Sequence, residues 1–141
     1  LALDNAEEIR TTGELDKAIE PALPGFASHK ELAKIYQALR IEVNHEMRSL
    51  EKFLSGAAES LKEGGILSVI TYHSLEDRMV KNFIKTGNVQ GEVKKDFYGN
   101  ILAPFKSLTR KPVLPHESEI ASNTRARSAK LRVAERVEEG Q

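Results

Sequence analysis

The sequence contains no cysteine, so this chain offers neither a disulfide framework nor thiolate ligands for zinc. Its four histidines lie at positions 29, 45, 73 and 116, a spacing that zinc sites do not use. The longest apolar run is far shorter than the roughly 18 residues of a membrane-spanning helix, and no segment resembles a signal peptide. The formal net charge is zero, so the overall charge gives no indication for or against a nucleic-acid partner. These absences predict a cytoplasmic protein without a metal site.

Length and composition are those of one soluble domain. The chain has 141 residues, of which 40% are hydrophobic and 30% charged, both within the range of soluble globular proteins. It begins at Leu1 and not at methionine, which suggests a processed or truncated product.

Residues 64–81 predict a strand, a tight turn and a helix. After a glycine pair, the uncharged residues 66–72 are dominated by Ile, Leu, Val, Thr and Tyr, which predicts a strand buried on both faces, as in parallel sheets. Apolar residues then recur at helical spacing. In open parallel sheets the ligand crevice lies beyond the carboxyl ends of the strands. We therefore expect His73 and Ser74 to lie at a site.

The same residues have alternative interpretations. Ser74 and Asp77 have the spacing of a capping box, in which two side chains satisfy backbone donors of the first helical turn. His73 faces either a polar crevice or a covering loop. Arg78 and Lys81 also suit an ordinary solvated helix face.

Residues 30–61 have the apolar periodicity of one long helix. An unbroken helix of this length would measure about 48 Å, well above the usual value, so we expect a bend or break near Asn44 or Gly56. Gln37, Arg40 and Asn44 fall on neighbouring faces, and they either reach a common cleft or form a polar stripe on a half-buried helix.

Turn residues divide the rest of the chain. A threonine cap predicts a short helix from Thr12 that stops near Pro21. Gly87 predicts the end of the central helix. Residues 88–103 show no sustained period, which indicates an irregular excursion or a small hairpin.

Two strands are predicted near the carboxyl terminus. Residues 105–109 form one, and residues 128–134 form the other, since small or apolar residues alternate there with basic ones. Strands so close in sequence most simply pair antiparallel at a sheet edge. Residues 118–121 predict one helical turn between them.

Basic residues are concentrated in residues 125–132, which contain no acidic residue: Arg125, Arg127, Lys130 and Arg132. Guanidinium groups bind phosphate oxygens in bidentate fashion, so the cluster suits phosphate. No aromatic residue lies among them, which argues against a base-stacking platform. The other interpretation is a solvated edge strand.

Three motifs occur in a characteristic order: Gln37-Ala-Leu-Arg-Ile-Glu-Val-Asn44, Tyr72-His-Ser-Leu-Glu-Asp-Arg-Met-Val-Lys81 behind Gly64-Gly65, and Asn123-Thr-Arg-Ala-Arg-Ser-Ala-Lys-Leu-Arg132. Together they resemble the C-terminal half of the bacterial 16S rRNA (cytosine-N4)-methyltransferases, over about residues 12–137. Residues 87–101 are similar to members from the Bacteroides lineage. The sequence departs from the family at Thr124, where proline is usual.

The resemblance implies a fold and a cofactor. The fold class is α/β, a partial class I (Rossmann-like) methyltransferase fold whose C-terminal strands and helices end in an antiparallel strand pair. Residues 1–30 would be the end of a helical insertion domain, and residues 31–141 the C-terminal part of the methyltransferase domain. The family uses S-adenosyl-L-methionine, which class I enzymes bind at a glycine-rich strand-to-helix loop and an acidic residue. Neither element occurs here, so we expect the cofactor site in a missing half and no activity from this fragment alone.

By the same resemblance, the substrate is 16S rRNA in the small ribosomal subunit, methylated at N4 of a decoding-centre cytosine. The implied catalytic residues at the base pocket are His73 and Ser74. The implied substrate-binding residues are Arg40 and Asn44 on the long helix, Asp77 and Arg78 as braces of the pocket, and Arg125, Arg127 and Lys130 on the RNA backbone. An exposed strand edge would favour a homodimer.

Two other functions are compatible with parts of the sequence. One is a non-enzymatic RNA-binding or interaction module, as the late basic cluster would suit. The other is a generic doubly wound nucleotide-binding domain, which the absence of a phosphate-binding glycine loop disfavours.

Overall fold

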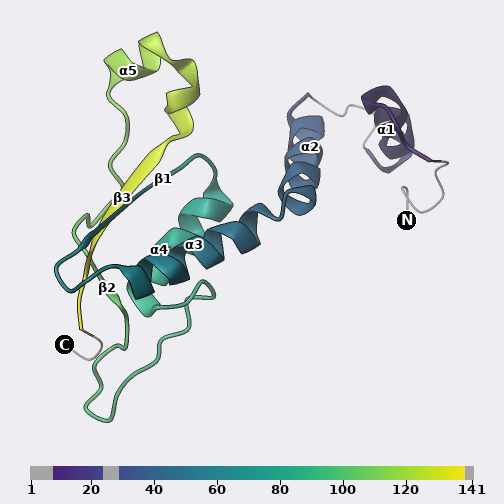
Figure 1. Cartoon of the computed structure of the whole chain (residues 1–141). Coiled ribbons are helices and arrows are strands. Elements are labelled where there is room, and N and C mark those ends of the chain that lie inside the picture. Colours follow the sequence, from purple (N-terminus) through teal and green to yellow (C-terminus); the bar gives the residue numbers. More distant parts are fainter. Residues whose placement is uncertain (1–7, 24–28, 139–141) are drawn as a thin grey trace. The chain divides into compact units, whose positions relative to one another are not determined.

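The computed structural model describes residues 8–23 and 29–138 (Figure 1). The chain divides into two compact units, residues 1–44 and 45–141. Within the described ranges, every helix is too short or too polar to cross a membrane.

The first unit contains helix α1 (Thr12–Ile19), a 3-10 turn (Glu20–Ala22) and helix α2 (His29–Val43). The predicted start of α1 is confirmed, and its cap is a capping box. The Thr11 hydroxyl accepts a hydrogen bond from the Glu14 amide at 3.2 Å, and the Glu14 carboxylate accepts one from the Thr11 amide at 2.9 Å. Within this unit, the Tyr36 hydroxyl of α2 donates to the Asp16 carboxylate of α1 at 2.7 Å.

The predicted long helix is interrupted where α2 ends at Val43 and α3 (Glu46–Ser60) begins, so the expected break near Asn44 is confirmed. His45 has a φ of 50°, in the left-handed region. That conformation costs a residue with a β-carbon about 1–2 kcal/mol and ends the helical hydrogen-bond ladder. Gly56 lies inside α3, which continues through it.

The second unit is built on a three-stranded sheet. Its further elements follow in chain order: β1 (Ile66–Thr71), α4 (Ser74–Thr86), β2 (Phe105–Ser107), α5 (Glu117–Ser122), a 3-10 turn (Thr124–Ser128) and β3 (Lys130–Arg136). The strand order is β1-β3-β2, and β3 is antiparallel to both neighbours. β1 and β2 are therefore parallel. The predicted antiparallel pairing of the last two strands is confirmed, and β3 is the central strand of the three.

Helices α3 and α4 pack on one face of this sheet (Figure 1). The buried core contains residues from both helices and all three strands: Leu54, Leu67, Val69, Val80, Phe83, Ile84, Phe105 and Ala134. Burial along β1 alternates strictly, and Ile66 and Ile70 on its other face are 51% and 57% exposed. The prediction that this strand is buried on both faces is wrong for the described residues, because helices cover only one face.

Gly87 ends α4 as predicted, with a φ of 77°. A β-carbon there would lie 3.0 Å from Cδ of Pro104. Glycine therefore fits this position for two reasons: it tolerates the positive φ, and it has no β-carbon to clash with Pro104. Residues 88–103 are largely irregular, with one small hairpin in which Lys95 bridges to Ile101. The Asp96 carboxylate closes its turn by accepting from the amides of Tyr98 and Asn100, each at 2.8 Å.

A buried ion pair joins α4 to the central strand. The Arg132 guanidinium on β3 donates two hydrogen bonds to the Asp77 carboxylate, at 2.7 Å from Nε and 3.1 Å from Nη2. The two side chains are 11% and 12% exposed. The hydrogen bonds from Arg132 hold the pKa of Asp77 below its usual value, against the opposing effect of burial.

Replacing Arg132 by methionine should lower the free energy of unfolding at pH 7 by about 3 kcal/mol, because the buried Asp77 charge would lose both hydrogen bonds from Arg132 and keep only Lys130, 3.7 Å away. Urea unfolding followed by circular dichroism measures this. As a control, Arg78→Met removes an exposed cation from α4, the helix that carries Asp77, and should change stability by less than about 0.5 kcal/mol.

Low pH should remove the stabilisation that the Asp77–Arg132 ion pair contributes. Because the folded-state pKa of Asp77 lies below its ordinary 3.8, the stabilisation is complete above about pH 5 and is lost as pH falls through the lowered pKa. Asp77→Asn should therefore lack this part of the acid profile. Identical losses between pH 5 and pH 2 in wild type and Asp77→Asn would contradict the account.

Candidate functional site

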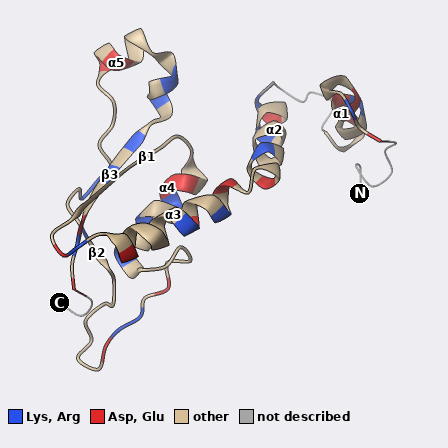
Figure 2. Ribbon diagram, viewed as in Figure 1, with Lys and Arg blue, Asp and Glu red and all other residues tan. Residues whose placement is uncertain are grey.

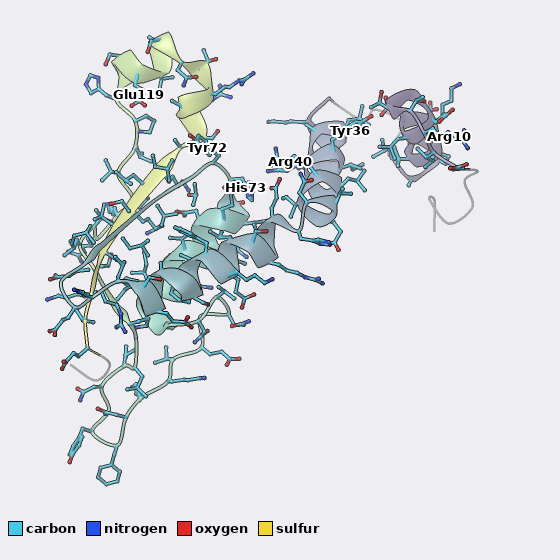
Figure 3. All side chains as sticks on the ribbon, in the orientation of Figure 1. Arg10, Tyr36, Arg40, Tyr72, His73 and Glu119 are labelled. Atoms are coloured by element: carbon cyan, nitrogen blue, oxygen red, sulfur yellow. The ribbon has the colours of Figure 1, made fainter. Side chains whose placement is uncertain are left out.

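His73 lies at the carboxyl end of β1, where the chain turns into α4 (Figure 3). It is the N-cap of α4: its backbone is extended, and its Nδ1 accepts a hydrogen bond from the Glu76 amide at 3.4 Å. The Glu76 carboxylate accepts one from the Tyr72 amide at 3.0 Å. The side chains of His73 and Glu76 therefore fix the strand-to-helix turn.

The capping-box interpretation of Ser74 and Asp77 is wrong. Ser74 is the first residue of α4, one position past the cap, and its side chain is exposed. The Asp77 carboxylate is directed to Arg132 on β3 and is unavailable to the first turn. The cap is shifted by one residue because the imidazole of His73 supplies the acceptor.

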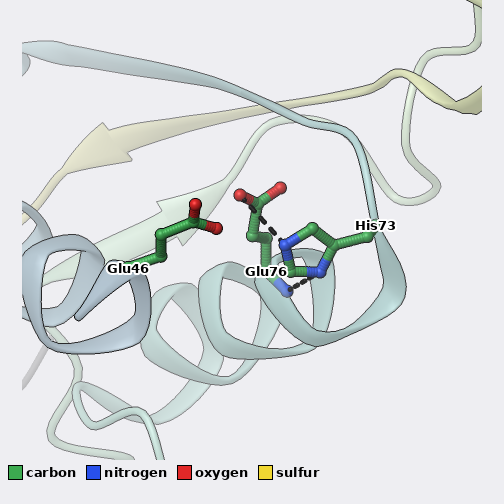
Figure 4. Close-up of side chains that lie close together, drawn as sticks. All are labelled: Glu46, His73 and Glu76. Carbon is green, nitrogen blue, oxygen red and sulfur yellow. Dashed lines mark hydrogen bonds and ion pairs between the residues drawn. The ribbon is translucent and has the colours of Figure 1, made fainter. Parts of the chain in front are cut away.

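Three potential ligand side chains meet at this turn: Glu46 at the start of α3, His73 and Glu76 (Figure 4). One ligand atom from each lies within 4.8 Å of the others. Nε2 of His73 is 3.2 Å from Oε1 of Glu76. That distance suffices for an ion pair, but Nε2 is buried without the geometry of a hydrogen bond. We call these three residues the His73 cluster.

The hydrogen-bonding of the imidazole decides what the His73 cluster can hold. Nδ1 accepts from a backbone amide, so in the neutral ring the proton is on Nε2, which faces the carboxylate. A metal ion at Nε2 would need the lone pair of that nitrogen. In this tautomer the Nε2 lone pair is not available, so the arrangement does not favour a metal at Nε2.

Asp77 and Arg78 lie one turn after His73 on α4, and they differ in exposure to solvent. Asp77 is 9% exposed and pairs with Arg132, while Nζ of Lys130 lies 3.7 Å from its second carboxylate oxygen. Arg78 is exposed to solvent. Lys130, expected on RNA, is thus brought beside Asp77.

Arg132 is a residue of this site that sequence reasoning did not place there. The signal was present, because strict alternation along residues 128–134 places Lys130 and Arg132 on the same face of the strand. The sequence alone did not indicate that this face meets Asp77 on α4, 55 positions away along the chain.

Arg125 and Arg127 lie in the 3-10 turn that leads into β3, and both are exposed. The turn is capped by Asn123, whose side-chain oxygen accepts from the Arg125 amide at 3.2 Å, and it is anchored by buried Ala126. Figure 2 shows Lys and Arg along this turn and β3.

Arg40 and Asn44 lie at the end of α2 in the first unit, where the Asn44 amide donates to the Arg40 carbonyl at 3.0 Å (Figure 3 labels Arg40). Their approach to the site stays a prediction.

Comparison with known proteins identifies relatives across nearly the whole chain. The sequence profile of the MraW methylase family matches residues 2–137. A ribosomal RNA small subunit methyltransferase H from Bacteroides thetaiotaomicron is 55% identical over 132 residues, which are 94% of this chain and 43% of that protein. Proteins of the same name from Bacteroides fragilis and Flavobacterium johnsoniae are 55% and 54% identical over 130 and 129 residues.

The chain therefore spans less than half the length of these relatives, with 42% to 43% of each covered. The predicted resemblance, including its Bacteroides-like character, is confirmed. Since the family profile covers almost every residue, the chain belongs to the MraW methylase family.

Proposed function

We propose that this chain is the C-terminal part of an S-adenosyl-L-methionine-dependent methyltransferase that acts on N4 of a decoding-centre cytosine in 16S rRNA. The observation that supports it is the placement of His73, within a family-matched motif, at the carboxyl end of β1. Ligand sites of α/β sheets lie at that end of the strands.

The sheet topology supports a class I methyltransferase fold. β1 and β2 are parallel and are joined through α4, while β3 enters antiparallel between them. In this proposal the three strands are the C-terminal edge of a larger sheet. Among the described residues, β1 pairs only with β3, so its other edge is open to the remaining strands of the complete enzyme.

The described residues do not fit the cofactor. The turn between β1 and α4 contains no glycine, and the side chains of Glu76 and His73 already accept from two of its backbone amides, those of Tyr72 and Glu76. We therefore assign cofactor binding to the part of the enzyme outside this chain, and residues 1–30 to the end of an insertion domain. The chain alone would be inactive, and its open edge and exposed Ile66 and Ile70 would favour self-association.

The chain's own residues would receive the substrate base. The cytosine amine is a poor nucleophile because its lone pair is delocalised, so methylation depends on positioning and on a proton acceptor. The base must also leave its stack. His73 and exposed Ser74 would line the base pocket, with the Asp77–Arg132 pair holding α4 behind them. Arg78 would brace the pocket with Asp77, and Arg40 and Asn44 would approach it from α2. The proposed contacts to the RNA backbone are Arg125, Arg127 and Lys130.

We predict that the isolated 141-residue chain does not bind S-adenosyl-L-methionine measurably, because the residues that would hold it lie elsewhere. Calorimetric titration is the test. A micromolar dissociation constant would contradict the assignment of the cofactor site, whereas RNA binding without cofactor binding is compatible with it.

His73→Ala in the complete enzyme should lower the methylation rate far more than it lowers stability. Loss of the cap alone costs about 1 kcal/mol of stability. His73→Asn is the matched variant, since an asparagine amide oxygen can still cap α4 while the ring is removed. Full turnover by His73→Asn would show that the ring is only a cap.

Arg125→Ala combined with Arg127→Ala should weaken RNA binding and leave the rate at saturating RNA largely unchanged. Removing one phosphate interaction should reduce the slope of log affinity against log salt by about 0.7 to 0.9. Filter binding across a salt series measures this. Unchanged affinity and slope would make the turn an ordinary solvated surface.

A further inference from the structure

A second, separate feature of the sheet unit is a pocket of about 550 Å³ beside α4, bounded by β2 and by the segment that follows it. Four cationic side chains line this pocket: Lys81, Lys85, Arg110 and Arg132. Its lining, among the residues that the structure describes, includes no carboxylate. We call it the cationic pocket.

Three of these cations lack an anionic partner in the described part of the chain. Within residues 8–23 and 29–138, no carboxylate forms an ion pair with Lys81, Lys85 or Arg110. Lys81 and Lys85 are one turn apart on α4, a spacing at which like charges destabilise a helix. Positive charges gathered around one cavity repel one another, and a bound anion would relieve that repulsion.

The wall of the cationic pocket is held rigidly. The Ser107 hydroxyl donates to the Thr109 carbonyl at 2.8 Å, and the Leu108 amide donates to the Val133 carbonyl at 2.9 Å. The Thr109 hydroxyl in turn accepts from the Val133 amide at 3.2 Å. These bonds fix the backbone of the segment that leads to Arg110 against β3, while the Arg110 side chain itself is exposed.

The floor of the pocket is apolar. Ile84 and Phe105, which are 4% and 3% exposed, belong to the core beneath it, and Leu108 on the wall is 50% exposed. A cationic rim over an apolar floor suits a ligand that combines a phosphate with a sugar or base better than it suits a small inorganic anion.

The cationic pocket is joined to the candidate site through Arg132. Ser107 of β2 pairs with Ala134, which also pairs with Leu67 of β1, so the segment after β2 starts level with Leu67, whereas His73 lies past the Thr71–Lys130 pair at the other end of β1. Arg132 lines the pocket and also bonds Asp77, one helical turn beyond His73. A polynucleotide that places a base at His73 would reach this pocket with a phosphate further along its chain.

We propose that the cationic pocket binds a backbone phosphodiester of the RNA substrate, further along the chain from the nucleotide that enters the site. This inference rests on the proposed function and adds to it a second phosphate-binding surface, distinct from Arg125 and Arg127. It gives a role to Lys81, which the sequence alone leaves as a candidate for a solvated helix face.

The test is a double variant of the complete enzyme, Lys81→Gln with Lys85→Gln, titrated with 16S rRNA across a salt series. We expect affinity at low salt to fall on the order of tenfold, and the salt slope to fall by about 0.7 to 0.9 for each lysine that binds a phosphate. Inorganic phosphate, titrated separately, should bind too weakly to compete. Tight competition by inorganic phosphate would instead make the pocket a small-anion site and overturn the proposal.

Matched controls separate the pocket from general charge removal. Lys62→Gln with Lys95→Gln removes the same charge from exposed positions outside the pocket and should leave affinity nearly unchanged. Lys81→Arg with Lys85→Arg keeps both charges and should retain binding. Equal reductions of affinity in the pocket and control variants would overturn the proposal.

The experiments also distinguish failure of the pocket proposal from failure of the proposed methylation reaction. Methylation of 16S rRNA by the wild type, together with unchanged binding by Lys81→Gln/Lys85→Gln, would overturn this inference alone. Pocket-dependent RNA binding without methylation by the wild type would support the inference and overturn the proposed reaction.

Discussion

The structure of the sheet unit depends on the ion pair between Asp77 and Arg132, which holds α4 against the central strand. On one side of this pair, α4 begins at His73, the cap of the strand-to-helix turn. On the other side, Arg132 lines the cationic pocket. One buried contact thus sets the distance between the proposed base site and the proposed phosphate site. A pair of this kind contributes little net stability compared with apolar packing, so its value here is in fixing geometry.

The candidate residues fall into two groups that differ in exposure to solvent. The side chains of His73 and Asp77 are largely buried against their own chain, whereas Ser74, Arg78, Arg125 and Arg127 are exposed. Buried groups are held in one geometry by packing and hydrogen bonds, which suits positioning of a base. Exposed cations retain mobility and hydration, which suits contacts to a phosphate backbone whose energy depends on salt.

Local signals predicted the elements well, and long-range contacts escaped prediction. The break near Asn44, the stop at Gly87 and the pairing of the last two strands follow from length, backbone freedom and proximity in sequence. The spacing of Ser74 and Asp77 offered a cap at Ser74 as one interpretation, but the ring of His73 takes that role. The contact between Asp77 and Arg132 joins residues 55 positions apart, and no periodicity indicates it. The one-sided burial of β1 depends on what covers its other face, which lies beyond any local pattern.

The most direct test of the account is to locate the methyl group. The complete enzyme would be incubated with small-subunit rRNA and S-adenosyl-L-methionine bearing an isotopically heavy methyl group, and the digested RNA analysed by mass spectrometry. The account predicts heavy N4-methylcytidine at a single position of the 16S rRNA. Label on a ring carbon, on ribose or on another base, or no label in the presence of bound RNA, would contradict it.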